Sequence, residues 1–282
     1  MIKIISDSTC DLTKDLLAKY EVAIIPLHIH LGEAEYEDGI NITPDEIYKW
    51  SDENKTTPKT SAPSITEVVK LMRNMAGEND ELICFSVSES MSASANVMRL
   101  AAEELEIEDR VHVINSANLS TGVGHQIIAA AMMIKEGKSS AEIVSAIEKM
   151  REKVRASFVV DTLTYLHRGG RCSSVAALAG SVLKLHPKIV VENGKMEATK
   201  KYRGKMDSVI MTYVKDMESE LLTAKKDRVF ITHSGCDAGI VAQVRAYLES
   251  LNHFEEILIT RAGSVISSHC GPGTLGVLFV EG

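Results

Sequence analysis

Small hydroxyl-bearing residues recur where predicted strands give way to helices, and they are the side chains best suited to chemistry. The sets that follow four predicted strands are Asp7/Ser8/Thr9, Ser86/Ser88/Ser90/Ser92, Asn115/Ser116 and His233/Ser234, and Thr60/Ser61 opens a helix in the same half. In open α/β sheets, ligands bind outside the carboxyl ends of the strands. Free N–H groups and the helix dipole favour negative charge there. The pattern therefore indicates a site for a small anion, although the same residue types are also ordinary helix N-caps.

The kind of anion is narrowed by motifs that the chain lacks. Neither Gly-x-Gly-x-x-Gly nor a P-loop is present, so a carboxylate fits better than a phosphate. There is no His-x-x-x-His pair and no carboxylate cluster in the sequence, so we expect no metal and no cofactor.

Covalent catalysis is the competing hypothesis. Ser92, Cys236 or Cys270 could be a nucleophile with His233 or His269 as its base, as in an acyl hydrolase or another Ser/Cys–His enzyme. No Gly-x-Ser-x-Gly elbow supports this alternative. His269 attracts attention because we expect it to sit in a Gly/Pro-rich loop, with Cys270-Gly271-Pro272-Gly273 directly after it.

Two basic features stand apart from the hydroxyls. Phe158–Arg171 is expected to be a short buried strand and one helical turn, ended by Arg168-Gly169-Gly170-Arg171. Its arginines can bind a carboxylate or phosphate, or can simply lie at a helix C-terminus. The stretch from Lys184 to Lys205 is also basic, which suits an acidic partner, a phosphate or a membrane surface, or protects an exposed hairpin edge.

The elements that must position these residues alternate between strand and helix as far as the Phe158 strand, which is typical of a parallel α/β sheet. Expected strands are Ile2–Ile5, Val22–Leu31, Glu81–Val87 and Val111–Ile114; expected helices are Leu12–Tyr20, Pro44–Trp50, Ile65–Met75, Ala93–Leu105, Leu119–Lys135 and Ala141–Val154. Beyond Arg171 we expect a helix over Val175–Leu185, a hairpin around Asn193-Gly194, a long helix over Gly204–Ala224, a helix over Ala238–Leu251 and strands at Arg228–Thr232, Glu256–Thr260 and Gly276–Val280. The change of pattern places a domain boundary near residues 155–160.

Composition sets outer limits on function. The chain has 282 residues, of which 45% are hydrophobic and 25% charged, as in a soluble protein of about two domains. A net charge of −8 and 5% aromatic residues argue against a nucleic-acid partner. Five scattered cysteines and a strand-like N-terminus favour the cytoplasm over secretion.

Six short motifs, taken in order, resemble the DegV family of bacterial fatty-acid-binding proteins of the FakB type. They are Ser6–Leu12, Thr60–Ser64, Ser86–Asn96, Phe158–Arg171, His233–Cys236 and Val265–Gly273. The resemblance implies two α/β domains, a parallel-sheet three-layer domain at 1–156 and a mixed one at 157–282, with a long-chain fatty acid between them. It also implies a carrier that is no enzyme itself: a separate fatty-acid kinase phosphorylates the bound carboxylate, and the acyl phosphate feeds phospholipid synthesis.

The same resemblance assigns site residues. Carboxylate contacts fall on Thr60, Ser61 and Ser92, with His269 and Gly271 close by, and Arg171 and Arg203 match positions that face the kinase. The chain departs from the family pattern in two places: Ala62 replaces a common glutamine, and Ala93-Ser94-Ala95 replaces a Gly-Thr-aromatic run.

Overall fold

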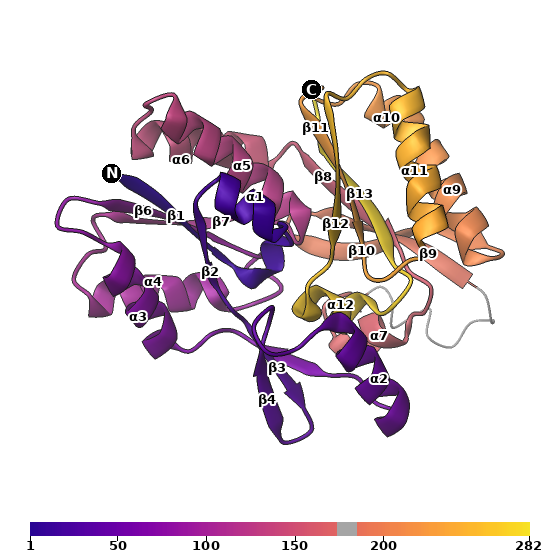
Figure 1. Cartoon of the computed structure of the whole chain (residues 1–282), viewed down its shortest axis with the longest axis horizontal. Helices are drawn as coiled ribbons and strands as arrows, with labels where there is room; N and C mark the ends of the chain where they lie inside the picture. The colour runs from indigo at the N-terminus through magenta and orange to yellow at the C-terminus, as the bar shows by residue number, and fades with distance from the viewer. Residues whose placement is uncertain (174–184) are drawn as a thin grey trace.

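A computed structural model describes the whole chain except residues 174–184, so the helix expected over Val175–Leu185 lies outside the described residues. The chain folds into two principal sheets with helices packed on their faces, and a small third sheet projects from them beside one helix (Figure 1). No helix in the described part of the chain is both long and apolar enough to cross a membrane.

The first sheet is parallel, as the alternation predicts, with strand order β2-β1-β6-β7. Its strands are β1 (Ile2–Asp7), β2 (Val22–Ile25), β6 (Glu81–Ser86) and β7 (Val111–Asn115). One face packs against α3 (Ile65–Met75) and α4 (Ser94–Glu104), and the other against α5 (Thr121–Lys135) and α6 (Ser140–Arg151). A short helix η1 (Ser8–Cys10) and α1 (Lys14–Lys19) follow β1. The result is the expected three-layer α/β/α arrangement.

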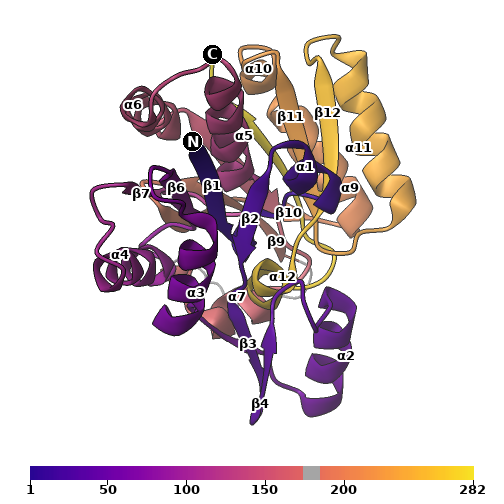
Figure 2. The same cartoon turned by 60° about the vertical axis from the view of Figure 1, so that its left-hand side comes forward.

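The second sheet is mixed, with strand order β10-β9-β8-β13-β11-β12. Its strands are β8 (Val154–Val159), β9 (Leu185–Glu192), β10 (Lys195–Arg203), β11 (Arg228–His233), β12 (Glu256–Arg261) and β13 (Leu275–Val280), and only β11 and β12 pair in parallel. Helices α9 (Met206–Asp216), α10 (Glu218–Leu221) and α11 (Ala238–Ser250) lie on its outer face (Figure 2). The Asn193-Gly194 hairpin is confirmed, with positive φ at both residues.

Helix α5 joins the two sheets. Its His125 ring is buried, donates a 3.0 Å hydrogen bond from Nε2 to the Leu278 carbonyl of β13, and meets the Phe230 ring edge-on at 4.8 Å between centroids. One hydrophobic core contains Ile4 and Ile83 from the first sheet together with Phe230 and Leu278 from the second. The domain boundary between residues 156 and 157 therefore stays a prediction, because the core runs across it.

Three expectations about the chain's path are wrong. Val22–Leu31 is two strands in two sheets, because Pro26 has no N–H to continue the ladder. The small sheet contains β3 (His28–Leu31), β4 (Ala34–Glu37) and β5 (Lys59–Ser61) and lies near α2 (Pro44–Asn54). The long helix expected over Gly204–Ala224 divides at Met217 into α9 and α10.

The third error concerns the glycine-rich region near the C-terminus. His269 and Cys270, which we expected in a loop, form the last turn of α12 (Ser264–Cys270), which packs beside α7 (Thr164–Gly169). Gly271 and the residues after it leave the helix, as expected. His269 is consequently held on a helix, and its position is set by packing along that helix.

Candidate functional site

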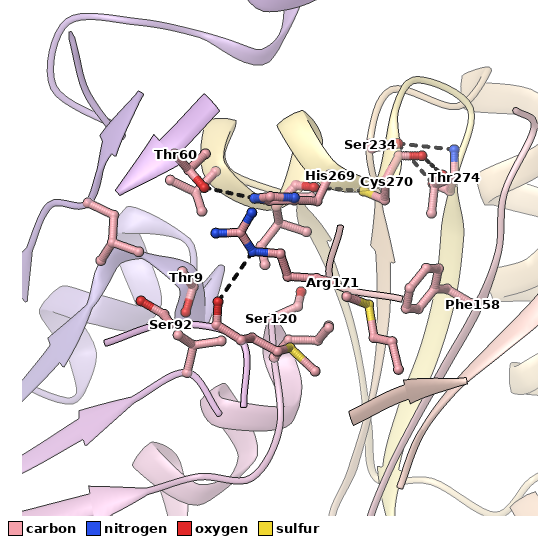
Figure 3. A pocket seen from close by; sticks show the side chains of 18 of the residues that line it. Thr9, Thr60, Ser92, Ser120, Phe158, Arg171, Ser234, His269, Cys270 and Thr274 are labelled. Atoms are coloured by element: carbon pink, nitrogen blue, oxygen red, sulfur yellow. Dashed lines mark hydrogen bonds between the residues drawn. The ribbon is translucent and has the colours of Figure 1, made fainter. Parts of the chain in front are cut away.

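A cavity of about 260 Å³ lies between the carboxyl ends of the first sheet and the inner face of the second. Typical ligand pockets measure about 300–1,000 Å³, so the volume of this cavity lies just below that range. Most of its wall is apolar; the apolar lining residues include Leu27, Val87, Met91, Leu119, Phe158, Leu166, Met196, Val265, Ile266 and Leu278. Thr60, Ser92, Arg171 and His269 lie together on one side of it, here called its polar end, and Ser234 and Thr274 lie on the other side (Figure 3).

Thr60 and His269 meet at that polar end. Thr60 lies on β5, where it pairs with Ile29 of β3, and His269 lies on the last turn of α12. Thr60 Oγ1 and His269 Nε2 are 2.8 Å apart, a contact between residues 209 positions apart in the sequence. Both line the cavity, as does the neighbouring Ser61, whose hydroxyl lies 3.0 Å from His30 Nε2.

Two buried carboxyl groups anchor the start of α12. Asp11 Oδ1 accepts from the Gly263 N–H at 2.8 Å, and Asp38 Oδ1 accepts from the Ser264 N–H at 2.7 Å. A Cβ at Gly263 would lie only 3.2–3.3 Å from these carboxyl oxygens, so glycine lets both approach. Burial raises the pKa of Asp11 to about 8, so its carboxyl group favours the neutral form at pH 7. The helix that carries His269 is thus fixed at its N-terminus.

His269 is a neutral imidazole. Burial, and then the nearby Arg171 charge, lower the pKa of His269 to about 4. Its Nδ1 is buried without a hydrogen-bond partner among the described residues. A Cβ at Gly169 would lie 2.4 Å from that nitrogen, which explains the first glycine of the Arg168–Arg171 motif. If the single ring proton sits on Nε2, His269 donates to Thr60, and the Thr60 hydroxyl can donate into the cavity.

Ser92 lies on the opposite side of the polar end, just before α4. Its Oγ accepts from the Ser94 N–H at 3.3 Å and lies 2.9 Å from Ser94 Oγ. Ala93 has φ −85°, so the methyl that replaces the family's glycine causes no backbone strain. Ala62 also lines the cavity, where its small side chain leaves room that a glutamine would fill.

Arg171 reaches the cavity from the end of the α7 segment. Its Nη1 donates to the Gly169 carbonyl at 2.6 Å, and its Nε donates to the Met91 carbonyl at 3.5 Å. The guanidinium lies beside His269 and Thr60 (Figure 3). The sequence motif left open whether this arginine binds an anion or only ends a helix, and the resemblance implied that it faces a kinase. In the structure Arg171 lines the cavity.

Gly271 and Arg203 are not among the described residues that line the cavity. Gly271 has φ +74°, and a Cβ there would lie 2.6 Å from the Tyr165 ring, so it serves the packing of α12 on α7. Arg203 is exposed at the end of the edge strand β10. Their assignment to ligand and partner binding stays a prediction.

Ser120 is a lining residue that the sequence argument missed. It precedes α5, and its hydroxyl donates to Asp11 Oδ2. The pattern used for the other hydroxyls could have found it, because Ser120 also lies between a strand of the parallel sheet and a helix N-terminus. Thr232 and Thr274 line the cavity as well, but nothing in their local sequence distinguishes them.

The residues proposed for a Ser/Cys–His enzyme are not assembled into a dyad in the described part of the chain. Cys270 Sγ donates to the Ile266 carbonyl, and Cys236 Sγ to that of Thr274. Burial raises the pKa of both thiols to about 12, so neither is a thiolate near neutral pH. Ser92 is hydrogen-bonded to Ser94, with no histidine joined to it.

One group of possible metal ligands forms only in three dimensions. His28, Glu37 and Glu67 bring ligand atoms within 4.8 Å of one another. The His28 ring already contacts Glu35 through Nδ1 and Glu67 through Nε2 at 3.0 Å. We therefore assign this group to the packing of the β3–β4 hairpin on α3.

Comparisons with known proteins agree with this architecture. A family model described as "Uncharacterised protein, DegV family" matches residues 1–282. A DegV domain-containing protein of Deinococcus radiodurans is 31% identical over 98% of this chain and 97% of its own length.

Two solved structures are similar over nearly their whole length. One is a DegV family protein from Thermus thermophilus described by its fatty-acid binding, with TM-score 0.91, 32% identity and 99% coverage of both chains. The other is a stearic-acid-binding protein from Eubacterium ventriosum, with TM-score 0.86, 28% identity and coverage of 100% of this chain and 98% of its own. The chain described here belongs to the DegV family.

Proposed function

We propose that this protein binds a long-chain fatty acid in the cavity between its two sheets, with the carboxylate at Thr60, Ser61, Ser92 and His269. The observation that carries the proposal is one mostly apolar cavity in which Thr60, Ser92, Arg171 and His269 lie together on one side. The fatty-acid binding of the Thermus thermophilus relative and the stearic-acid binding of the Eubacterium ventriosum relative support it.

The energetics assign different tasks to the two ends of the ligand. A long acyl chain has about 14–16 methylenes, each worth about 0.8 kcal/mol when buried. The gross gain exceeds roughly 10 kcal/mol before the cost of ordering the chain. Each hydrogen bond to the head group adds only about 1–3 kcal/mol. The tail therefore supplies affinity, and the polar end selects the head group.

Native mass spectrometry of protein purified from bacterial cells tests this proposal. We expect a mass excess equal to one long-chain fatty acid, which extraction and gas chromatography then identify. A matched preparation of the Met196→Asp variant, whose cavity wall is charged, should carry none. A homogeneous ligand-free mass of the wild-type protein, together with no uptake of added octadecanoic acid, would contradict the proposal.

We further propose, from the family resemblance, that the protein is a cytoplasmic carrier without turnover of its own. A separate fatty-acid kinase would phosphorylate the bound carboxylate, and the acyl phosphate would enter phospholipid synthesis, with a transient membrane-surface contact. Arg203 is exposed on β10, which supports its proposed contact with the kinase. We propose that Arg171 contacts the kinase as well. Arg203→Glu should leave fatty acid bound while blocking its kinase-dependent phosphorylation.

A further inference from the structure

The cavity wall has one permanently charged side chain among its described residues. Among the described residues that line it there is no Asp, Glu or Lys, and Arg171 is the one side chain with a permanent charge. Two histidines also line it, and burial lowers the pKa of both, so they are neutral near pH 7. His233 in addition accepts from the Gly235 and Cys236 N–H groups through Nδ1.

Neutral hydroxyls alone do not distinguish an acid from an alcohol. Thr60 and Ser92 can hydrogen-bond a carboxylate, a protonated acid, an ester carbonyl or a hydroxyl group. Bringing a carboxylate out of water into an apolar cavity costs several kcal/mol unless an opposite charge or several donors compensate. A cavity with neutral hydroxyls and no cation would therefore favour an uncharged lipid.

Arg171 has the geometry to supply the missing charge. Its side chain runs across the polar end, between the Gly169 carbonyl on the α7 side and the Met91 carbonyl on the α4 side. These bonds use two of the five guanidinium N–H groups. No Asp or Glu forms an ion pair with Arg171 in the part of the chain that the structure describes. The guanidinium lies beside Thr60 and His269, and Ser92 lies across from it (Figure 3).

We propose that Arg171 is the residue that makes this cavity select an ionised carboxylate over a neutral lipid head group of the same chain length. This inference rests on the proposed function and deepens it, and it gives Arg171 a role toward the ligand that needs no kinase. A charge-assisted hydrogen bond from arginine is about twice as strong as one between neutral groups, so the effect falls on the acid alone.

The test compares two ligands that differ only in their head group. Delipidated protein is titrated with radiolabelled octadecanoic acid and with octadecan-1-ol at pH 7.5, and the ratio of the two affinities is measured. For Arg171→Gln we expect the preference for the acid to fall at least tenfold, about 1.4 kcal/mol, with alcohol affinity unchanged. Arg171→Lys, which keeps the charge without the planar donors, should retain part of the preference.

Arg168→Gln is the matched control. Like Arg171, Arg168 is exposed and donates to a backbone carbonyl, that of Lys55 at 3.2 Å. Unlike Arg171, it is not among the described residues that line the cavity. Its acid-to-alcohol ratio should equal that of the wild type. An unchanged ratio in Arg171→Gln, or equal losses for acid and alcohol, would overturn the inference while leaving the fatty-acid site intact. Wild-type protein that binds neither ligand would instead overturn the proposed function itself.

Discussion

The two walls of the cavity are built in different ways. The first sheet contributes the loops at its carboxyl ends, and these carry polar groups: Thr9, Ser92 and Ser120. The second sheet contributes the flat inner face of its strands, and this face carries bulk: Phe158, Met196 and Leu278.

Loops at helix N-termini expose free N–H groups and favour hydroxyls, whereas the face of a sheet has its backbone paired and favours apolar side chains. The proposed division between head-group and tail binding would thus follow from backbone geometry. Four predictions test this difference, and they run from the largest expected effect to the smallest.

Charging the apolar wall should abolish binding. Met196→Asp places a carboxylate beside the tail, where burying an unpaired ion costs several kcal/mol. We expect affinity for octadecanoic acid to fall by about three orders of magnitude, roughly 4 kcal/mol. Met196→Leu preserves volume and should bind nearly as well as the wild type in the same titration. If Met196→Asp still bound normally, the tail would not lie along this wall.

Acidification should weaken the junction between the walls. Burial lowers the pKa of His125 to about 4, so its neutral form stabilises the fold fully above the unfolded value of about 6.5. That contribution is lost as pH falls from about 6.5 to 4, by up to roughly 3 kcal/mol.

Urea unfolding at pH 7.5 and 5.0 measures the effect. His125→Gln keeps a donor for the Leu278 carbonyl and removes this contribution, so the wild type should lose more stability than the variant between the two pH values. The raised pKa values of Asp7 and Asp11 stabilise the fold on acidification in both proteins and cancel in this comparison. An unaltered pH dependence in His125→Gln would assign the acid sensitivity to other groups.

Removing single hydroxyls from the polar wall should have a moderate effect. Thr60→Val keeps the shape but removes the hydrogen bonds to His269 and to the ligand. We expect about tenfold weaker binding of octadecanoic acid, or about 1.4 kcal/mol, and a similar loss for Ser92→Ala. Ser250→Ala, at the exposed end of α11, is the control and should leave binding unchanged. Full affinity in both cavity variants would move the head group elsewhere.

Restoring the family's glycine should change little. Ala93 already has φ −85°, so Ala93→Gly adds freedom without relieving strain. We expect affinity within about twofold of the wild type and a change in stability below about 1 kcal/mol, because the greater freedom of glycine in the unfolded chain opposes its preference over alanine at an N-cap. A large gain in affinity would show that the methyl obstructs the head group.

The parts of the fold that were predictable are those with local causes. Ser64 and Glu67 form a reciprocal capping box, and the helix they begin, Ile65–Met75, has the predicted bounds. Asn193-Gly194 makes its hairpin through backbone preferences of two residues. Thr9 after β1 and Ser92 after β6 line the cavity for a similarly local reason, since every carboxyl end of a parallel sheet opens on the same edge, whereas Ser8, Ser86, Ser88 and Ser90 are not among the described lining residues.

The rest depends on contacts between distant residues. β5 forms because Thr60 pairs with Ile29, which precedes it in the sequence by more than the length of α2. Its three residues alone do not predict a strand. The Gly/Pro content after His269 suggested a loop, but the carboxyl groups of Asp11 and Asp38 cap α12 from over 200 positions away. The approach of Arg171 to the polar end likewise required the packing of α7 on α12.

Because α5 belongs to the core of both sheets, the two halves cannot swing apart like a hinged shell without breaking that core. A fatty acid bound in the proposed way would therefore have to enter by small movements of side chains at the polar end. We expect slow exchange and long residence from such a route.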